Sequence, residues 1–100
     1  QLGEKLPQAF FAASDAIAIG AVKAFQEANI NIPKRVSIIS FNDTSIAKYT
    51  YPALSSIKVY TEEMGIEAVN KIQAIILAAK PRPAEKTIIK TDLVIRDSSL

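Results

Sequence analysis

The chain has 100 residues, of which 49% are hydrophobic and 22% charged, and its formal net charge is +2. This length suits one small domain or a piece of a larger one, and the composition is that of a soluble globular protein. Cysteine and histidine are both absent, which excludes disulfides, thiolate chemistry and the commonest general base and metal ligand. No apolar run approaches the ~20 residues of a membrane span. The scattered cations form no basic face of the kind that binds DNA.

The first half of the chain predicts a strand, a helix and a second strand. Residues 1–8 are polar and are expected to form a connector. The apolar run Ala9–Ala13 predicts a strand, and Ser14 and Asp15 directly after it are good helix N-caps. Apolar residues at helical spacing predict an amphipathic helix from Asp15 to about Ala28. Asn29 then suits the left-handed position that ends a helix.

The run Val36–Asp43 predicts a parallel strand that is buried on both faces, because its apolar residues follow one another almost without a break. With the preceding strand and helix it is expected to form a right-handed βαβ unit. Parallel sheets of this kind bind ligands beyond the carboxyl ends of their strands. Ser14–Asp15 and Asn42–Asp43 are therefore expected to meet at one edge of the sheet.

Two interpretations of these polar pairs stay open. In one, they are caps and turn-formers, because Ser, Asn and Asp readily bond their own backbone. In the other, they bind a polar ligand. Asn42 offers a donor and an acceptor together, and an ionised aspartate accepts from two hydroxyls at once, which suits a sugar or a nucleoside.

The second half of the chain predicts further α/β elements. Thr44–Pro52 is expected to be an ordered loop whose tyrosines serve a ligand, a subunit interface or ordinary packing, and Leu54–Tyr60 to be a third strand. Thr61 is expected to cap a second amphipathic helix over residues 61–79. Thr87–Thr91 and Leu93–Ile95 are further strand candidates. No glycine-rich phosphate loop, metal-spaced cluster or suitably placed pair of carboxylates beyond Asp15 and Asp43 is found, so no cofactor, no metal and no catalytic residue is expected.

In order and spacing, several motifs resemble the LacI/GalR family of bacterial transcription regulators, and most closely its galactose and β-galactoside repressors. These motifs are Ala13–Ala21, Ile32-Pro33, Val36–Asp43, Tyr51–Ile57, Glu63–Gly65, Ala68-Val69 and the closing segment Leu93–Ser99. The resemblance implies an α/β fold of the periplasmic-binding-protein-like type I, a parallel sheet flanked by helices. It also implies that the chain is a fragment containing parts of both lobes.

The resemblance further divides the chain between those two lobes. Residues 9–57 would belong to the C-terminal lobe of the effector-binding domain. Residues 58–91, with the helix 61–79 and a strand, would belong to the N-terminal lobe, and residues 92–100 would return to the C-terminal lobe. The helix-turn-helix that reads an operator in this family has no counterpart in this sequence.

Carried over residue by residue, the resemblance assigns effector binding to Ser14, Asp15 and Asn42. The family usually has Asp at the position of Asn42 and Gly at the position of Ser40, and the first difference removes a fixed negative charge from the site. The resemblance assigns the dimer interface to the first helix and the loop after the second strand. Its residues there are Ile19, Val22, Lys23, Ile46, Ala47 and Tyr49.

The function implied is that of a non-enzymatic, cytoplasmic effector-binding and dimerising region. The partners implied are a second copy of the chain, a small-molecule effector such as galactose or a galactoside, and operator DNA through the missing reading head alone; no membrane is implied. Two rivals are a transport-linked sugar-binding protein of the same fold and, less in keeping with the residues, a sugar hydrolase. Because both half-lobes would have incomplete apolar faces, the isolated 100-residue chain is expected to associate.

Overall fold

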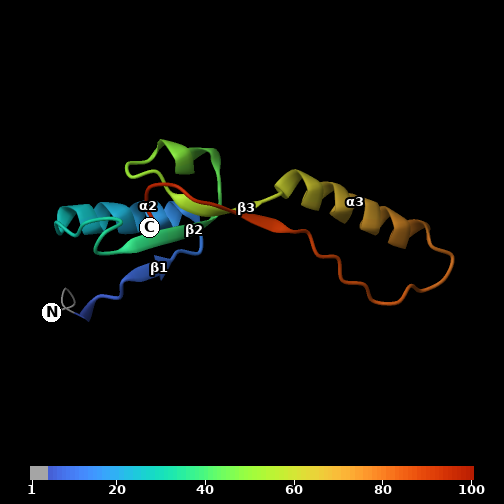
Figure 1. The fold of residues 1–100 in the computed structure, drawn as a ribbon. Helices are drawn as coiled ribbons and strands as arrows, with labels where there is room; N and C mark the ends of the chain where they lie inside the picture. Colours follow the sequence, from blue (N-terminus) through green and yellow to red (C-terminus); the bar gives the residue numbers. More distant parts are fainter. Residues whose placement is uncertain (1–4) are drawn as a thin grey trace. The chain divides into compact units, whose positions relative to one another are not determined.

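The computed structural model describes residues 5–100, so residues 1–4 of the expected connector lie outside the described part. The elements in chain order are β1 (Ala9–Phe11), α2 (Asp15–Glu27), β2 (Ser37–Asn42), the 3-10 helix η1 (Ser45–Tyr49), β3 (Ser55–Val59), α3 (Thr61–Leu77) and β4 (Thr91–Val94) (Figure 1). The four strands form one sheet in the order β1-β2-β3-β4.

The chain divides into two compact units. The first, here called the sheet unit, contains the described residues up to Val59 together with Asp92–Leu100, and the second, the helix unit, is Tyr60–Thr91. These boundaries lie close to the lobe boundaries expected after residues 57 and 91. Assignment of the units to particular lobes stays a prediction.

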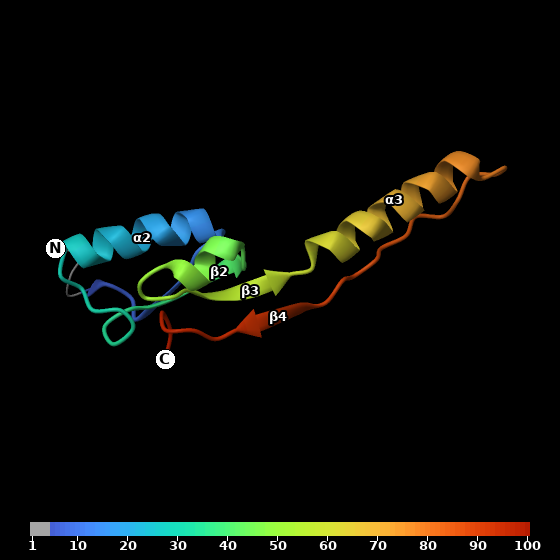
Figure 2. The same ribbon diagram turned by 90° about the horizontal axis from the view of Figure 1, so that it is seen from above.

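In the sheet unit, the predicted parallel βαβ arrangement is confirmed. β1 pairs with β2 in parallel, with Ala9 opposite Ser37, and β2 pairs with β3 in parallel, with Ser40 opposite Ser56. Helix α2 covers one face of this sheet (Figure 2). The buried core beneath it consists of Ala12, Ala18, Val22, Val36, Ile38, Ala47 and Leu54.

Strand β2 is covered on one face and not on both, which corrects the expectation from its apolar run. Ile38 and Ser40 are fully buried, whereas Ile39 and Phe41 on the other face are only half-buried. The physical reason is that the described part of the sheet unit contains a single α-helix, and a helix covers one face of a sheet. The continuous apolar character of β2 thus exceeds what this unit alone can bury.

Both ends of α2 follow the local chemistry that the sequence predicts. The Ser14 hydroxyl accepts a hydrogen bond from the Ile17 N–H at 3.3 Å, so Ser14 is the N-cap. Asn29, after the C-terminus, has φ 59°, the left-handed conformation that ends many helices. These contacts confirm the predicted helix to within one residue of its expected end.

The C-terminal tail closes the sheet unit. Strand β4 lies beside β3 and runs opposite to it (Figure 2), but it begins at Thr91, so the strand expected over Thr87–Thr91 is wrong except for its last residue. Further on, Ser98 is fully buried. Its N–H donates to the Ala53 carbonyl at 2.9 Å, its carbonyl accepts from the Ile38 N–H at 2.8 Å, and its hydroxyl donates to the Ile38 carbonyl at 2.6 Å. The tail therefore links β2 to the segment before β3.

The helix unit consists of α3 and the irregular segment that follows it. Tyr60 occupies the N-cap position and its side chain makes no capping hydrogen bond, so Thr61 is the first helical residue and the expected Thr61 cap is wrong. The segment after α3 returns along the helix, where the Lys71 ammonium and the Arg82 guanidinium contact the Glu85 carboxylate at 2.7 and 3.1 Å. Within residues 5–100, no helix has the length and apolar character needed to cross a bilayer.

Helix α3 buries none of its residues. Its predicted apolar stripe is present but uncovered, with exposed fractions between 55% and 74% for Ile66, Val69, Ile72 and Ile76. An amphipathic helix gains most of its stability by burying such a stripe. The exposed stripe is therefore the surface through which the isolated chain is expected to associate.

Candidate functional site

The carboxyl ends of β1 and β2 bring together the three residues predicted to bind an effector. Ser14 and Asp15 lie just after β1, and Asn42 is the last residue of β2, the neighbouring parallel strand. Ser14 and Asn42 are half-buried, whereas Asp15 has only 2% of its surface exposed. We call this region the strand-end edge.

Asp15 is the centre of a buried hydrogen-bond network. Its Oδ1 accepts hydrogen bonds from the hydroxyls of Ser40 and Ser56, the latter at 3.0 Å. Its Oδ2 accepts from both the backbone N–H and the hydroxyl of Thr44, each at 2.6 Å. Four donors from β2, β3 and the loop between them thus converge on the first residue of α2.

The hydrogen bonds also determine the charge state of Asp15. Burial raises the pKa of this carboxyl because it penalises the charged form, but the bonds from Ser40, the Thr44 hydroxyl, the Thr44 backbone and Ser56 together lower it below the ordinary value. Asp15 is therefore an ionised carboxylate at neutral pH. Its charge is stabilised by neutral donors.

A second charged contact lies next to this network. The Arg96 guanidinium Nη1 lies 2.6 Å from Asp43 Oδ1, with side-chain exposures of 19% and 12%, and it also donates to the Leu54 carbonyl at 2.8 Å. The Asp43 N–H donates to the Ser56 hydroxyl at 2.9 Å. Both the side chain and the backbone of Asp43 are thus held by other segments of the sheet unit.

The turn between these contacts has an unusual backbone. Asn42 has φ 104° and Asp43 has φ 51°, a conformation that residues other than glycine rarely adopt. Asn and Asp are the residues that tolerate it best. The positive φ values fit the expectation that Asn42 and Asp43 shape the local backbone, whereas the Asp43 carboxylate bonds Arg96. Ligand binding by Asn42 stays a prediction.

Sequence reasoning missed four members of this region: Ser40, Thr44, Ser56 and Arg96. The register offers the signal that could have found two of them, since Ser40 and Ser56 are directly opposite and both lie on the buried face of the sheet. Two buried serines on one face require a polar partner. Arg96 lies 53 residues from Asp43, and no local pattern indicates that contact.

The residues predicted for a dimer interface differ in their burial. Lys23, Ile46 and Tyr49 are exposed and Ile19 is half-buried. Val22 and Ala47 have exposed fractions of 5% and 0% and belong to the chain's own core. Only the four accessible residues can contribute contact area to an interface with a second copy.

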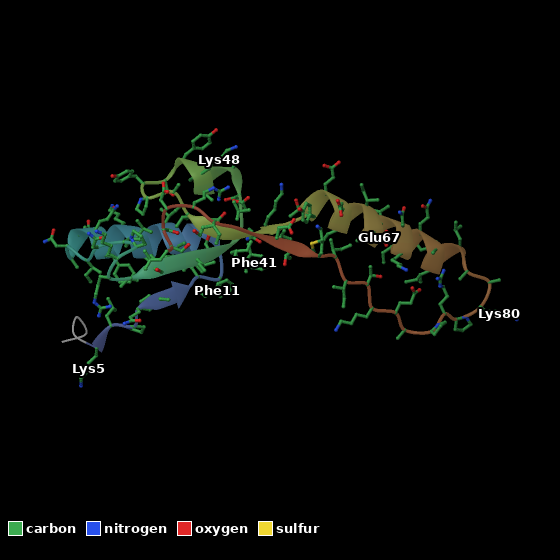
Figure 3. All side chains as sticks on the ribbon, viewed as in Figure 1. Lys5, Phe11, Phe41, Lys48, Glu67 and Lys80 are labelled. Atoms are coloured by element: carbon green, nitrogen blue, oxygen red, sulfur yellow. The ribbon has the colours of Figure 1, made fainter. Side chains whose placement is uncertain are left out.

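Two further features lie near the strand ends. Phe11 and Phe41, the former 62% exposed, meet edge to face with their ring centroids 6.3 Å apart (Figure 3).

At the amino edge of the strands, a hollow of about 520 Å³ is lined by Gln26, Asn29, Ile30, Asn31, Ile32, Pro33, Tyr51, Pro52 and Asp97. Across residues 5–100, no group of three or more carboxylate, histidine or cysteine side chains is placed to hold a metal ion.

Comparison with known proteins identifies close relatives. Residues 1–99 match the periplasmic binding protein-like domain. The chain is 50% identical over 97 residues to the HTH-type transcriptional regulator GalR of Streptococcus thermophilus. The matched residues make up 97% of this chain and 29% of that relative. The chain thus spans less than a third of the relative's length.

The solved structures that resemble this chain include transcriptional regulators as well. A sugar-binding transcriptional regulator of the LacI family from Escherichia coli, complexed with phosphate, matches with 40% identity and a TM-score of 0.74, over 91% of this chain and 32% of that one. The transcriptional regulator CelR in complex with cellobiose matches with 26% identity and a TM-score of 0.84, over 91% of this chain and 28% of that one. The expected fold class is therefore confirmed.

Proposed function

Because the chain belongs to the periplasmic binding protein-like domain family, in the form found in GalR and LacI transcriptional regulators, we propose that it is part of the effector-binding region of such a regulator. The relatives are transcriptional regulators, not enzymes, and they favour this function over that of a transport-linked sugar-binding protein. Operator binding would come from a helix-turn-helix outside these 100 residues.

The proposed effector is a sugar, such as galactose or a galactoside, held at the strand-end edge. Ser14 and Asn42 would supply hydroxyl and amide groups for sugar hydroxyls, with Asp15 in the same site. The observation that carries this proposal is the convergence of Ser14, Asp15 and Asn42 at the carboxyl ends of two neighbouring parallel strands. Relatives described as sugar-binding or complexed with cellobiose support the same ligand class.

Regulation by such an effector requires differential binding. A sugar changes operator affinity only if it binds two conformations of the regulator with different affinity; equal binding shifts no population. The regulator would act in the cytoplasm as a homodimer. The accessible residues Ile19, Lys23, Ile46 and Tyr49 would form part of its interface, where an exposed tyrosine offers apolar area together with a hydrogen-bonding tip.

A ligand screen on the intact protein tests the proposed effector. Thermal-shift and calorimetric titrations would use galactose, a β-galactoside, cellobiose and a purine. At 100 times its dissociation constant, a true effector should raise the free energy of unfolding by about 2.7 kcal/mol. Binding of the purine alone would overturn the sugar assignment.

The Asn42→Ala variant then tests the site. It is expected to weaken binding of the sugar found in the screen at least tenfold, an order of magnitude typical for loss of a good hydrogen bond. Sedimentation should show the same dimer as the wild type, because Asn42 is not among the proposed interface residues. Unchanged sugar affinity would remove Asn42 from the site.

A further inference from the structure

Asp15 is held by more contacts than a helix terminus requires. Ser14 already caps α2, and an acidic residue in a first turn gains from the helix dipole without being buried. Asp15 is nevertheless 98% buried and accepts four hydrogen bonds. Burying a carboxylate costs free energy unless donors compensate it. The segments that donate these hydrogen bonds therefore indicate what Asp15 does.

Those donors lie in the turn Asn42–Thr44 itself and in β2 and β3 beside it. Thr44, the last residue of the turn, donates its N–H and its hydroxyl to Asp15 Oδ2. The Asp43 N–H donates to the Ser56 hydroxyl, which in turn donates to Asp15 Oδ1. Two routes, one direct and one through Ser56, therefore join the turn to a single carboxylate.

These hydrogen bonds hold a backbone conformation that is unfavourable by itself. Backbone conformations with positive φ at residues other than glycine persist only where the surroundings determine them. The residue whose direction this turn sets is Asn42, with φ 104°. Both oxygens of Asp15 are occupied by the anchoring bonds, so the carboxylate acts on the turn instead of pointing outward from the edge.

We propose that Asp15 is the positioning residue of the strand-end edge: its buried carboxylate fixes the turn Asn42–Thr44 and thereby aims the Asn42 side chain at the effector. This inference rests on the proposed function for the role of Asn42. It assigns to Asp15 an indirect part in effector binding, exerted through hydrogen bonds to Thr44 and Ser56.

The first test needs no effector. Amide hydrogen exchange is measured in the intact protein for the wild type and for Asp15→Asn, comparing the Asp43 amide in the turn with the Ile38 amide in the core. The exchange rate of Asp43 relative to that of Ile38 is expected to rise at least about tenfold, as for loss of one good hydrogen bond. An equal acceleration of both amides would mean that Asp15 supports only global stability, and would overturn the proposal.

Two further variants keep this test decisive. Ser98→Ala removes buried hydroxyl bonds at the opposite edge of the strands, and it should accelerate Ile38 without raising the relative rate of Asp43. If Asp15→Asn does not fold, Thr44→Val replaces it, because this change removes only one of the four bonds. A few-fold rise in the relative rate of Asp43 in Thr44→Val supports the proposal, and no rise overturns it.

The second test separates this inference from the proposed function. Galactose affinity is measured for Asp15→Asn, Asn42→Gly and the double variant. If Asp15 acts through Asn42, the double variant should bind within about twofold of Asn42→Gly. Independent, multiplying losses would indicate direct contact by Asp15 and overturn the inference alone. Wild-type affinity in all three would remove galactose from this edge, and hydrogen exchange would still decide whether Asp15 holds the turn.

Discussion

Arg96 Nη1 lies 2.6 Å from Asp43 Oδ1 and thereby joins the tail to the turn that follows β2. The same nitrogen donates to the Leu54 carbonyl at 2.8 Å, which fixes the guanidinium between the turn and the start of β3. Both side chains are mostly buried, so solvent screens this pair less than it screens a surface pair. The strand-end edge is therefore supported from two sides, by Asp15 and by Arg96.

Replacing Arg96 should destabilise the sheet unit. Arg96→Ala leaves the Asp43 carboxylate mostly buried without its cation, and we expect the free energy of unfolding to fall by about 2 kcal/mol. Urea denaturation of the intact protein measures this change. Arg82→Ala is the matched control: Arg82 is 40% exposed and pairs with Glu85 at the surface, so its loss should lower the free energy of unfolding much less than the loss of Arg96 does. Equal effects of the two variants would contradict the supporting role of Arg96.

Two substitutions at Asn42 should separate backbone from side chain. Asn42 has φ 104°, which glycine adopts readily and alanine does not. Asn42→Ala should therefore lower the free energy of unfolding by about 1 kcal/mol more than Asn42→Gly does. Chemical denaturation measures this difference.

Effector affinity gives the complementary result at Asn42. Both variants lose the amide group, so both should bind the sugar more weakly. Asn42→Gly with full affinity would show that the turn, and not the amide, matters for binding.

Acid should destabilise the fold through Asp15. Its pKa is lowered in the folded state because the hydrogen bonds from Ser40, Thr44 and Ser56 outweigh the effect of burial. A lowered folded-state pKa adds stability that is complete above the ordinary aspartate pKa, about 3.9, and is lost as the pH falls from there through the folded-state value. Urea denaturation between about pH 3 and pH 7 should show this loss.

The variant comparison identifies the group responsible for the acid effect. Asp15→Asn should be less stable at neutral pH and should lose less stability on acidification than the wild type. Asp97→Asn, at an exposed position, should retain the wild-type profile. Parallel profiles for Asp15→Asn and the wild type would exclude Asp15 as the source.

The isolated 100-residue chain should associate through α3. Ile72 is 58% exposed within the apolar stripe, and Ile72→Lys should shift the chain toward smaller species in light scattering. Ala79→Lys adds the same charge just beyond the helix and should leave association unchanged. A wild-type chain that remains monomeric at high concentration would refute the idea that this stripe drives association.

Local chemistry explains which parts of the fold could be predicted from the sequence. The Ser14 cap, the helix that follows it and the left-handed Asn29 depend on neighbours within a few residues, and all three predictions are confirmed. The strand expected over Thr87–Thr91 is wrong because strand formation depends on a partner. β4 begins only at Thr91.

In the candidate site, too, some features could be predicted from the sequence and others depend on residues far away along the chain. Topology alone placed Ser14, Asp15 and Asn42 at one edge, because carboxyl ends of parallel strands coincide. The burial of Asp15 could not be foreseen, since its donors come from Ser40, Thr44 and Ser56, residues 25 to 41 positions away along the chain. A carboxylate that looks available in the sequence is thus occupied by internal contacts.

The buried position of Ser98 has a consequence for synthesis on the ribosome. Strands β1 to β3 leave the ribosome before the tail, yet the Ile38 backbone is paired with Ser98 and the Ser55 N–H donates to the Ser98 hydroxyl. These hydrogen bonds cannot form until the whole helix unit has been translated, a delay on the order of a few seconds. During that interval the Ile38 N–H and carbonyl, just ahead of the residues of β2 that pair with β3, lack their Ser98 partners, and a chaperone or another strand can reach them.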